Sequence, residues 1–235
     1  MSHAAAVPVV LLHGCGGSAA ETFVESSWPG ALRAVGREAR VLNLPGHGKT
    51  GCTHSPSDYA DLAGSLLAHL PAGPFDIVGF SLGAKLALAL TLRLPARVGR
   101  LVLGGLGDNV FAPERIAPAA AAALEHGPTA DTPAPVIAFL REWNPALNDA
   151  LAVAAVLRRP ANPVVTADQL RQITIPVLLI NGAQDAVGHQ ADALVAALPD
   201  VRLITLAGTG HFDLPRNPAF RQQAIAFLTT SRTAT

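Results

Sequence analysis

The chain has little charge, and its charges cancel. Only 14% of its 235 residues are charged, and 17 Lys and Arg residues balance 17 Asp and Glu residues. A nucleic-acid-binding protein normally carries a basic excess or a basic run, so we expect no nucleic-acid partner. Half of the residues are hydrophobic, which also excludes a disordered chain.

Cysteines and long hydrophobic runs are also scarce. Cys15 and Cys52 do not form the spaced framework of a disulfide-rich protein, and they indicate a reducing compartment. The apolar runs, for example residues 7–12 and 177–180, fall far short of the ~20 residues that span a bilayer. The N-terminus lacks the cationic start of a signal peptide. We therefore expect a cytoplasmic protein with no membrane partner.

The sequence does contain alternating strand and helix patterns. Residues 7–12 form a continuous apolar run rich in β-branched residues, which is typical of a strand buried on both faces of a parallel sheet. The expected strands are residues 7–12, 39–44, 75–79, 98–104, 176–181 and 201–206. The expected helices are residues 28–36, 57–70 (with Ser57 as N-cap), 82–94, 189–198 and 218–229. This alternation predicts an α/β fold with a doubly wound, mainly parallel sheet of about six strands.

Residues 108–173 interrupt this alternation. They are rich in Ala and Pro, show no clear strand, and carry Phe111, Phe139 and Trp143. We expect a helical insertion that packs, because the segment holds enough apolar residues. Ligands bind at the carboxyl ends of the strands in such sheets. The sequence thus predicts a core of residues 1–107 and 174–235 and a helical cap or lid of residues 108–173.

The strongest local motif is Gly79-Phe80-Ser81-Leu82-Gly83, which follows one expected strand and precedes an expected helix. A nucleophile elbow has this context, with the serine exposed on a sharp turn at the edge of the sheet. Bulk at either flanking position would clash with the neighbouring strand or helix, which explains Gly79 and Gly83. The motif predicts Ser81 as a nucleophile.

A glycine-rich turn, His13-Gly14-Cys15-Gly16-Gly17, follows the first expected strand. Its backbone N–H groups could bind an oxyanion. The same turn fits a loose dinucleotide-binding pattern, but that pattern requires an acidic residue at the end of the next strand. The next strand ends in Leu42-Asn43-Leu44, without an acid, so we disfavour the nucleotide interpretation.

A serine nucleophile needs a base and an acid that orients the base. His211 follows the last expected strand and Asp185 follows the fifth, so both lie at the same end of the sheet as Ser81. The chain order Ser, Asp, His is that of this architecture. Asp108, after the fourth strand, is a rival acid because its loop opens at the same edge. Asp213 is too close to His211 in sequence to orient it.

These motifs together resemble the α/β-hydrolase fold family over nearly the whole chain. Four features match in order: HGCGG, LPGHG, GFSLG, and the pair NGAQD and GTGH. The resemblance implies that Ser81 is the nucleophile, His211 the general base and Asp185 its acid. It also implies an oxyanion hole formed by the backbone N–H groups of Cys15 and Leu82.

The resemblance to this family implies no catalytic role for two of the histidines and one thiol. The resemblance implies that His13 and His47 brace their loops and that the thiol of Cys15 is incidental. No histidine has a partner at metal-ligand spacing, and we expect no metal and no cofactor.

The chain departs from the family at its start. Family members usually have two strands before the one that ends in His-Gly, whereas about six residues precede that strand here. We therefore expect the first hairpin to be missing, which leaves six parallel strands and no antiparallel one.

The predicted function is hydrolysis of a small, uncharged, largely apolar carboxylic ester through an acyl-enzyme. The expected substrate-binding residues are Gly14, Phe111, Phe139, Trp143 and Phe212. The same triad also serves thioesterases, lactonases, carbon–carbon bond hydrolases and lyases, and fold does not choose among them. A small-ligand receptor without turnover is the alternative of another class. Family members with an Asp nucleophile are disfavoured by Ser81.

Overall fold

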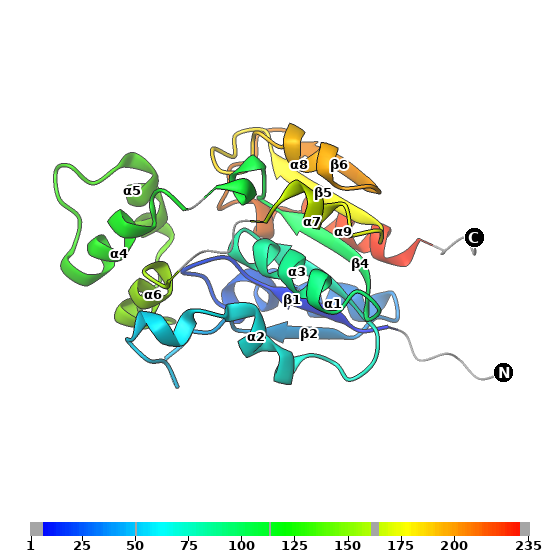
Figure 1. Ribbon diagram of the computed structural model, residues 1–235, viewed down its shortest axis with the longest axis horizontal. Helices are drawn as coiled ribbons and strands as arrows, with labels where there is room; N and C mark the ends of the chain where they lie inside the picture. Colours follow the sequence, from blue (N-terminus) through cyan, green and yellow to red (C-terminus); the bar gives the residue numbers. More distant parts are fainter. Residues whose placement is uncertain (1–6, 50, 113, 161–164, 231–235) are drawn as a thin grey trace.

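The computed structural model describes residues 7–49, 51–112, 114–160 and 165–230. One sheet runs through it (Figure 1). Its strands are β1 (Val9–Leu12), β2 (Ala39–Leu42), β3 (Phe75–Phe80), β4 (Val98–Gly104), β5 (Val177–Gly182) and β6 (Val201–Leu206). They lie in the order β2-β1-β3-β4-β5-β6, and every neighbouring pair is parallel. Six parallel strands without an antiparallel one, as predicted, are confirmed for these residues.

Helices cover both faces of the sheet. Residues along β1 alternate between the two faces, as the two-residue period of a strand requires. Val9 and Leu11 pack with Trp28 of α1 (Trp28–Ala34) and Phe220 of α9 (Pro218–Thr229). Val10 and Leu12 belong to the cluster on the other face, which takes in α2 (Leu62–Leu66), α3 (Leu82–Arg93) and α8 (Asp192–Ala197). The shorter helical turns are η1 (Ala20–Val24), η2 (Pro56–Tyr59), η3 (Leu67–His69) and η5 (Leu214–Arg216).

The helical segment, residues 108–173, joins β4 to β5. It contains η4 (Asp108–Phe111), α4 (Ala117–His126), α5 (Ala134–Glu142), α6 (Ala150–Leu157) and α7 (Ala167–Leu170). Figure 1 shows α4, α5 and α6 to the left of the sheet, beyond the end at which β1 leads into its loop. Val136 of α5 packs with Ala120 and Ala123 of α4 in a small apolar cluster of their own. The described part of the segment contains no strand, and its role as a lid stays a prediction.

Two expected helices differ from the structure. The helix expected over residues 57–70 is divided into η2, α2 and η3. Ser57 does not cap it; the carboxylate of Asp61 accepts a hydrogen bond from the N–H of Gly64 (2.9 Å) and caps α2 instead. The helix expected from residue 189 begins only at Asp192, and the side chain of Asp108 accepts hydrogen bonds from its first turn.

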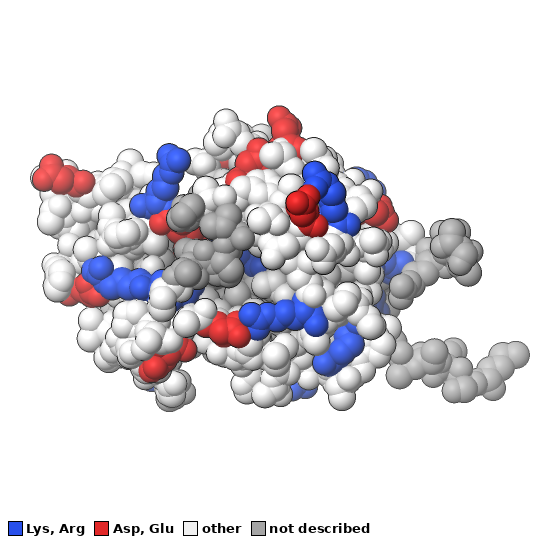
Figure 2. Space-filling view, in the orientation of Figure 1, with Lys and Arg blue, Asp and Glu red and all other residues white. Residues whose placement is uncertain are grey.

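The surface carries no large field of one sign on the face drawn in Figure 2, where blue and red side chains are scattered among white ones. This agrees with the balanced composition. In the described ranges, no helix combines the length and the apolar character that crossing a membrane requires.

Candidate active site

Ser81 lies at a strained turn between β3 and α3. Its φ is 52° and its ψ is −112°, a conformation that a residue with a side chain rarely adopts. A Cβ on Gly79 would lie 2.4 Å from the carbonyl oxygen of Gly83, and a Cβ on Gly83 would lie 2.1 Å from that of Leu12. Both glycines are therefore required by close backbone approach, as the sequence predicted.

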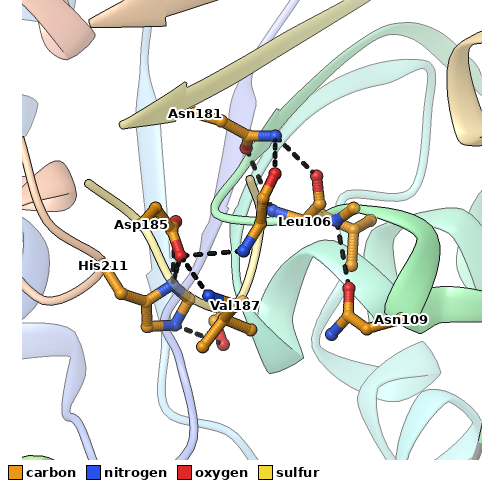
Figure 3. Close-up of polar contacts among 9 residues, drawn as sticks. Leu106, Asn109, Asn181, Asp185, Val187 and His211 are labelled. Carbon is orange, nitrogen blue, oxygen red and sulfur yellow. Dashed lines mark hydrogen bonds and ion pairs between the residues drawn. The ribbon is translucent and has the colours of Figure 1, made fainter. Parts of the chain in front are cut away.

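The structure brings together the three side chains that the motifs singled out. The hydroxyl of Ser81 donates to Nε2 of His211 across 3.1 Å. Nδ1 of His211 lies 2.9 Å from each carboxylate oxygen of Asp185 (Figure 3). Because Asp185 can only accept, Nδ1 carries the proton and Nε2 is free to take one from Ser81. The arrangement can transfer a proton from the serine to the histidine.

The loop after β5 holds Asp185 in its ionised form. Asp185 is fully buried, and its Oδ1 accepts hydrogen bonds of 2.8 Å from the N–H groups of Val187 and Gly188. Burial raises the pKa of this carboxyl, but the hydrogen bond and charge of His211 and the two N–H groups outweigh it, so the pKa is lowered. Asp185 is thus an anion at neutral pH beside His211.

Asn181, the fifth residue of β5, braces this loop, and sequence reasoning missed it. Its Nδ2 donates to the carbonyl groups of Leu106 (2.8 Å) and Gly188 (2.6 Å), and its Oδ1 accepts from the N–H of Leu106 (3.1 Å) (Figure 3). The sequence feature that indicates its role is a polar residue directly after the apolar run 177–180. These bonds fix the loop of Asp185 against the end of β4.

Asp108, the rival acid, is engaged elsewhere. Its carboxylate accepts hydrogen bonds from the N–H groups of Ala193 (3.3 Å) and Leu194 (2.8 Å) at the start of α8. Negative charge at a helix N-terminus is stabilised by the unpaired N–H groups and the helix dipole. The structure thus brings Asp185, and not Asp108, into contact with His211.

The glycine-rich turn after β1 lies against the elbow. The N–H of Gly17 donates to the carbonyl of Gly14 (3.2 Å), and Gly16 has a φ of +74°. A type II turn requires this positive φ at its third residue, which explains the glycine. A Cβ on Gly14 would lie 3.3 Å from Cβ of Ser81. We call residues 14–17 the oxyanion turn, after the role that the sequence predicted for the N–H of Cys15.

The second expected oxyanion donor, Leu82, is the first residue of α3. The first N–H groups of a helix have no acceptor within the helix, and the helix dipole makes this end favourable for an anion. The N–H of Leu82 is therefore placed beside Ser81 with no partner inside α3.

His13 and His47 brace the loops around the turn. His13 accepts from the N–H of Leu44 (3.0 Å) through Nε2 and contacts the carbonyl of Gly14 (2.8 Å) through Nδ1. His47 accepts from the N–H of Gly16 (2.9 Å) through Nε2. Burial above all lowers the pKa of His13 to about 3 and that of His47 to about 4. Both rings are neutral at pH 7, which leaves each Nε2 able to accept.

The thiol of Cys15 is unreactive where it lies. Burial, with a smaller effect of the Glu114 charge, raises its pKa to about 12. A thiol is nucleophilic as the thiolate, and this one stays protonated at neutral pH. The role expected for Cys15 therefore depends on its backbone N–H and not on its sulfur.

A cavity of about 540 Å³, its open mouth included, lies between the oxyanion turn and α5. Its lining includes Ser81 and His211 and four of the expected substrate-binding residues, Gly14, Phe139, Trp143 and Phe212. Phe111 is not among the described residues that line it.

Phe111 packs against the core cluster on the α3 face of the sheet instead. It belongs to η4, which directly follows β4, so it stays close to the sheet rather than reaching the cavity. Its expected role in binding substrate is therefore not supported by its position.

Three charged residues, Glu21, Glu142 and Arg216, also line the cavity, and the Arg216 guanidinium lies 3.2 Å from Oε2 of Glu142. This pair joins α5 to η5, and no sequence motif indicated it. Among the described residues, no group of three or more His, Cys, Asp and Glu side chains could hold a metal ion.

Comparisons with known proteins show which sequences and folds the chain resembles. A sequence profile described as the alpha/beta hydrolase family matches residues 9–222. A pimeloyl-[acyl-carrier protein] methyl ester esterase from Aromatoleum aromaticum is 33% identical, over 89% of this chain and 93% of that protein. One from Nitrosomonas europaea is 27% identical, over 86% and 88%.

Solved structures share the fold. The enol-lactonase from Burkholderia xenovorans superposes with a TM-score of 0.75 at 22% identity, over 97% of this chain and 94% of that chain. NosK from Streptomyces actuosus gives 0.70 at 24% identity, over 95% and 97%.

Proposed function

The chain belongs to the alpha/beta hydrolase family, and from this we propose that it is a serine hydrolase that cleaves a small, uncharged, largely apolar carboxylic ester. One observation carries the proposal: the unbroken chain of contacts from Ser81 Oγ through His211 to Asp185, at 3.1 Å and 2.9 Å. A serine activated by a base that an acid orients is the arrangement that nucleophilic acyl transfer requires.

In the first step, Ser81 attacks the ester carbonyl while His211 takes the hydroxyl proton through Nε2. The carbonyl oxygen becomes an anion beside the N–H groups of Cys15 and Leu82, which stabilise it. The intermediate collapses as the carbon–oxygen bond to the alcohol breaks and His211 returns its proton to the leaving alkoxide. The alcohol departs, and the acyl group stays on Ser81. Asp185 stabilises the positive charge that His211 carries in between.

In the second step, water replaces the alcohol. His211 takes a proton from the water as its oxygen attacks the acyl carbon. The tetrahedral anion forms at the same two N–H groups, and its collapse breaks the bond to Ser81, which regains its proton from His211. The carboxylic acid leaves, and the free enzyme is restored.

The cavity supports an uncharged, apolar substrate. Phe139 and Trp143 of the helical segment and Phe212 line it, while the charged Arg216 is already paired with Glu142. Aromatic walls favour apolar groups because they replace water at the surface of the ligand. We further propose that α4–α6 form a lid, since Phe139 of α5 and Trp143, which directly follows α5, line the cavity that contains Ser81.

The named relatives suggest a second candidate substrate. The proteins from N. europaea and A. aromaticum are methyl ester esterases that act on a carrier-bound pimeloyl group. A methyl ester is itself small and uncharged at the reacting end, so this chain could take a methyl ester of a longer acyl group. Thioesterase, lactonase, carbon–carbon bond hydrolase and lyase activities use the same triad, and a receptor without turnover is the alternative of another class.

We propose a cytoplasmic location, because two cysteines in 235 residues do not form the spaced framework of a disulfide-rich protein.

The test combines labelling with turnover. A serine-directed fluorophosphonate should modify Ser81, as mapped by mass spectrometry, and p-nitrophenyl esters of increasing acyl length should be hydrolysed. Replacing Ser81 with Ala should remove both. A panel of methyl esters of long and short acyl groups distinguishes the second candidate. Full ester turnover by the Ser81→Ala variant, or binding of an apolar ligand without any turnover by the wild type, would contradict the proposal.

A further inference from the structure

Asn148 joins three segments that are distant in sequence. It lies just before α6 in the helical segment, and it is 1% exposed. Its Nδ2 donates to the carbonyl of Gly16 in the oxyanion turn across 3.0 Å. Its Oδ1 accepts from the N–H of Gly48 in the loop after β2 across 2.9 Å. A single buried side chain thus connects the helical segment to the turn beside Ser81.

The contacts of Asn148 determine which way its amide points. The NH₂ group faces a carbonyl, which can only accept, and the oxygen faces an N–H, which can only donate. Turning the amide over would place two acceptors together at Gly16 and two donors together at Gly48. Because the site is buried, either mismatch would leave polar groups unpaired at a cost of about 1–3 kcal/mol each.

Gly16 is held from three directions. Its N–H donates to His47, its carbonyl accepts from Asn148, and a Cβ at this position would lie 2.5 Å from the ring of Phe139 in α5. The peptide groups on both sides of Gly16 are therefore fixed. In a β-turn, the peptide between the two central residues can rotate between the type I and type II geometries. The contacts of Gly16 hold this peptide in its observed orientation.

The central peptide joins Cys15 to Gly16, so its orientation sets the ψ angle of Cys15, and holding it limits how far the preceding peptide, which carries the Cys15 N–H, can turn. The N–H of Cys15 must point at the oxyanion to stabilise it, and a donor that is misdirected by an ångström loses most of its effect. The turn contains two further glycines, Gly14 and Gly17, whose backbones are intrinsically free. Rigidity has to come from outside the turn.

We propose that Asn148 is a positioning residue that fixes the oxyanion turn and makes the orientation of the Cys15 N–H depend on the helical segment. This inference rests on the proposed function, because it assigns Asn148 a part in stabilising the oxyanion of that reaction. Asn148 is not among the described residues that line the cavity, whereas its partner Gly16 is. Asn148 acts through Gly16, on the transition state rather than on the binding of the substrate.

The test replaces the NH₂ group alone. Asn148→Asp keeps the oxygen that accepts from Gly48 and puts an acceptor opposite the carbonyl of Gly16. Asn144→Asp is the matched control: it makes the same chemical change in the same segment, where the side-chain oxygen accepts from the N–H of Ala146 and does not touch the turn. Asn148→Ala provides a second, neutral variant should the aspartate prevent folding, and thermal melting monitors folding in all of them.

Two measurements follow on each variant: kcat and KM for p-nitrophenyl butyrate, and hydrogen–deuterium exchange of the peptide that contains residues 13–17. For both Asn148 variants we expect kcat to fall by about 10–100-fold, less than the ~10²–10³ for removing an oxyanion donor outright. KM should stay within about twofold, and exchange in the turn should accelerate. Asn144→Asp should match the wild type in all three quantities.

The outcomes separate the inference from the proposed function. Folded Asn148 variants with wild-type kcat would overturn the inference, whatever their exchange shows, while the proposed function would stand. Wild-type protein that turns over no ester would overturn the proposed function. In that case unchanged exchange in the variants would overturn the coupling of Asn148 to the turn as well, and accelerated exchange would support it.

Discussion

Ser81 keeps its strained backbone because its neighbours leave no alternative. Its N–H donates to the carbonyl of Gly104 on β4 (2.8 Å), and its own carbonyl accepts from the N–H groups of Ala84 and Lys85 as α3 begins. A residue with φ near +52° costs of order 1–3 kcal/mol, which these bonds and the surrounding packing offset. The strain presents the hydroxyl at the edge of the sheet, clear of the strand that carries it.

The two acids near this edge have different environments, and substitution should separate them. Asp185→Asn removes the anion that holds the Nδ1–H of His211, so we expect kcat to fall by about 10²–10⁴-fold. Asp108→Asn should leave kcat within about twofold, and because it removes a negative charge from the N-terminus of α8 it should lower the free energy of unfolding by about 0.3–1 kcal/mol. Steady-state kinetics and urea unfolding measure the two effects. The opposite pattern would transfer the role of the acid to Asp108.

The residues that the sequence could predict are those with a local pattern. Ser81, Asp185 and His211 each follow a strand in a short motif, and chain order then places them at one edge of the sheet. Their proposed roles stay predictions, although their contacts are as expected. Asn148 and Asn181 have no such pattern, because their partners lie 132 and 75 residues away and only the folded chain brings them together.

Strands were predicted more closely than helices, for a physical reason. β4 and β6 begin and end where the sequence indicated, because each is a mainly apolar run bounded by turns, although β6 lies at the edge of the sheet and is not buried. The helix expected over residues 57–70 is broken, since Asp61 caps a new start within it. A polar side chain such as that of Asp61 can bind a backbone N–H and start a new helix, and the pattern of apolar residues does not indicate where this happens.

One buried ion pair ties together elements at the other end of the sheet. The guanidinium of Arg37 lies 2.6 Å from Asp76 of β3, and it also donates to the carbonyls of Val7 and Leu228. The side chains of the pair are 10% and 6% exposed. The guanidinium of Arg37, in the segment after α1, therefore links β3, α9 and the segment that leads into β1.

Removing Arg37 should be costly because Asp76 would stay buried without its partner. We expect Arg37→Ala to lower the free energy of unfolding by about 3–5 kcal/mol. The double variant Arg37→Ala with Asp76→Asn should recover part of that loss, since it removes the uncompensated charge. Urea denaturation at pH 7 measures both, and equal stability of Arg37→Ala and the wild type would contradict the expectation.

The stability of the whole protein should depend on two neutral histidines. In the unfolded chain a histidine titrates near pH ~6.5, whereas in the folded chain the pKa values of His13 and His47 are about 3 and about 4. Between about pH 6.5 and 4, these two histidines bind protons in the unfolded state but not in the folded state. The free energy of unfolding should therefore decrease as the pH is lowered through that window, by up to ~1.4 kcal/mol per pH unit for each histidine.

His47→Gln tests this dependence. A glutamine amide can accept from the N–H of Gly16 and stays neutral at every pH in the window. The variant should lose about half of the extra slope when the free energy of unfolding is measured by urea denaturation at pH 7, 6 and 5. An unchanged slope would show that acid destabilises the protein through other groups.

The order of the motifs along the chain has a consequence for the protein during its synthesis. The nucleophile emerges from the ribosome with β3, the acid follows β5, and the base follows β6. A nascent chain that has folded β1 to β4 carries the serine but neither of its partners. On the proposed assignment, hydrolytic activity appears last, when β6 has docked beside β5. The nascent protein thus hydrolyses no ester until its sheet is complete. The time at which turnover begins can therefore be used to measure the final step of folding.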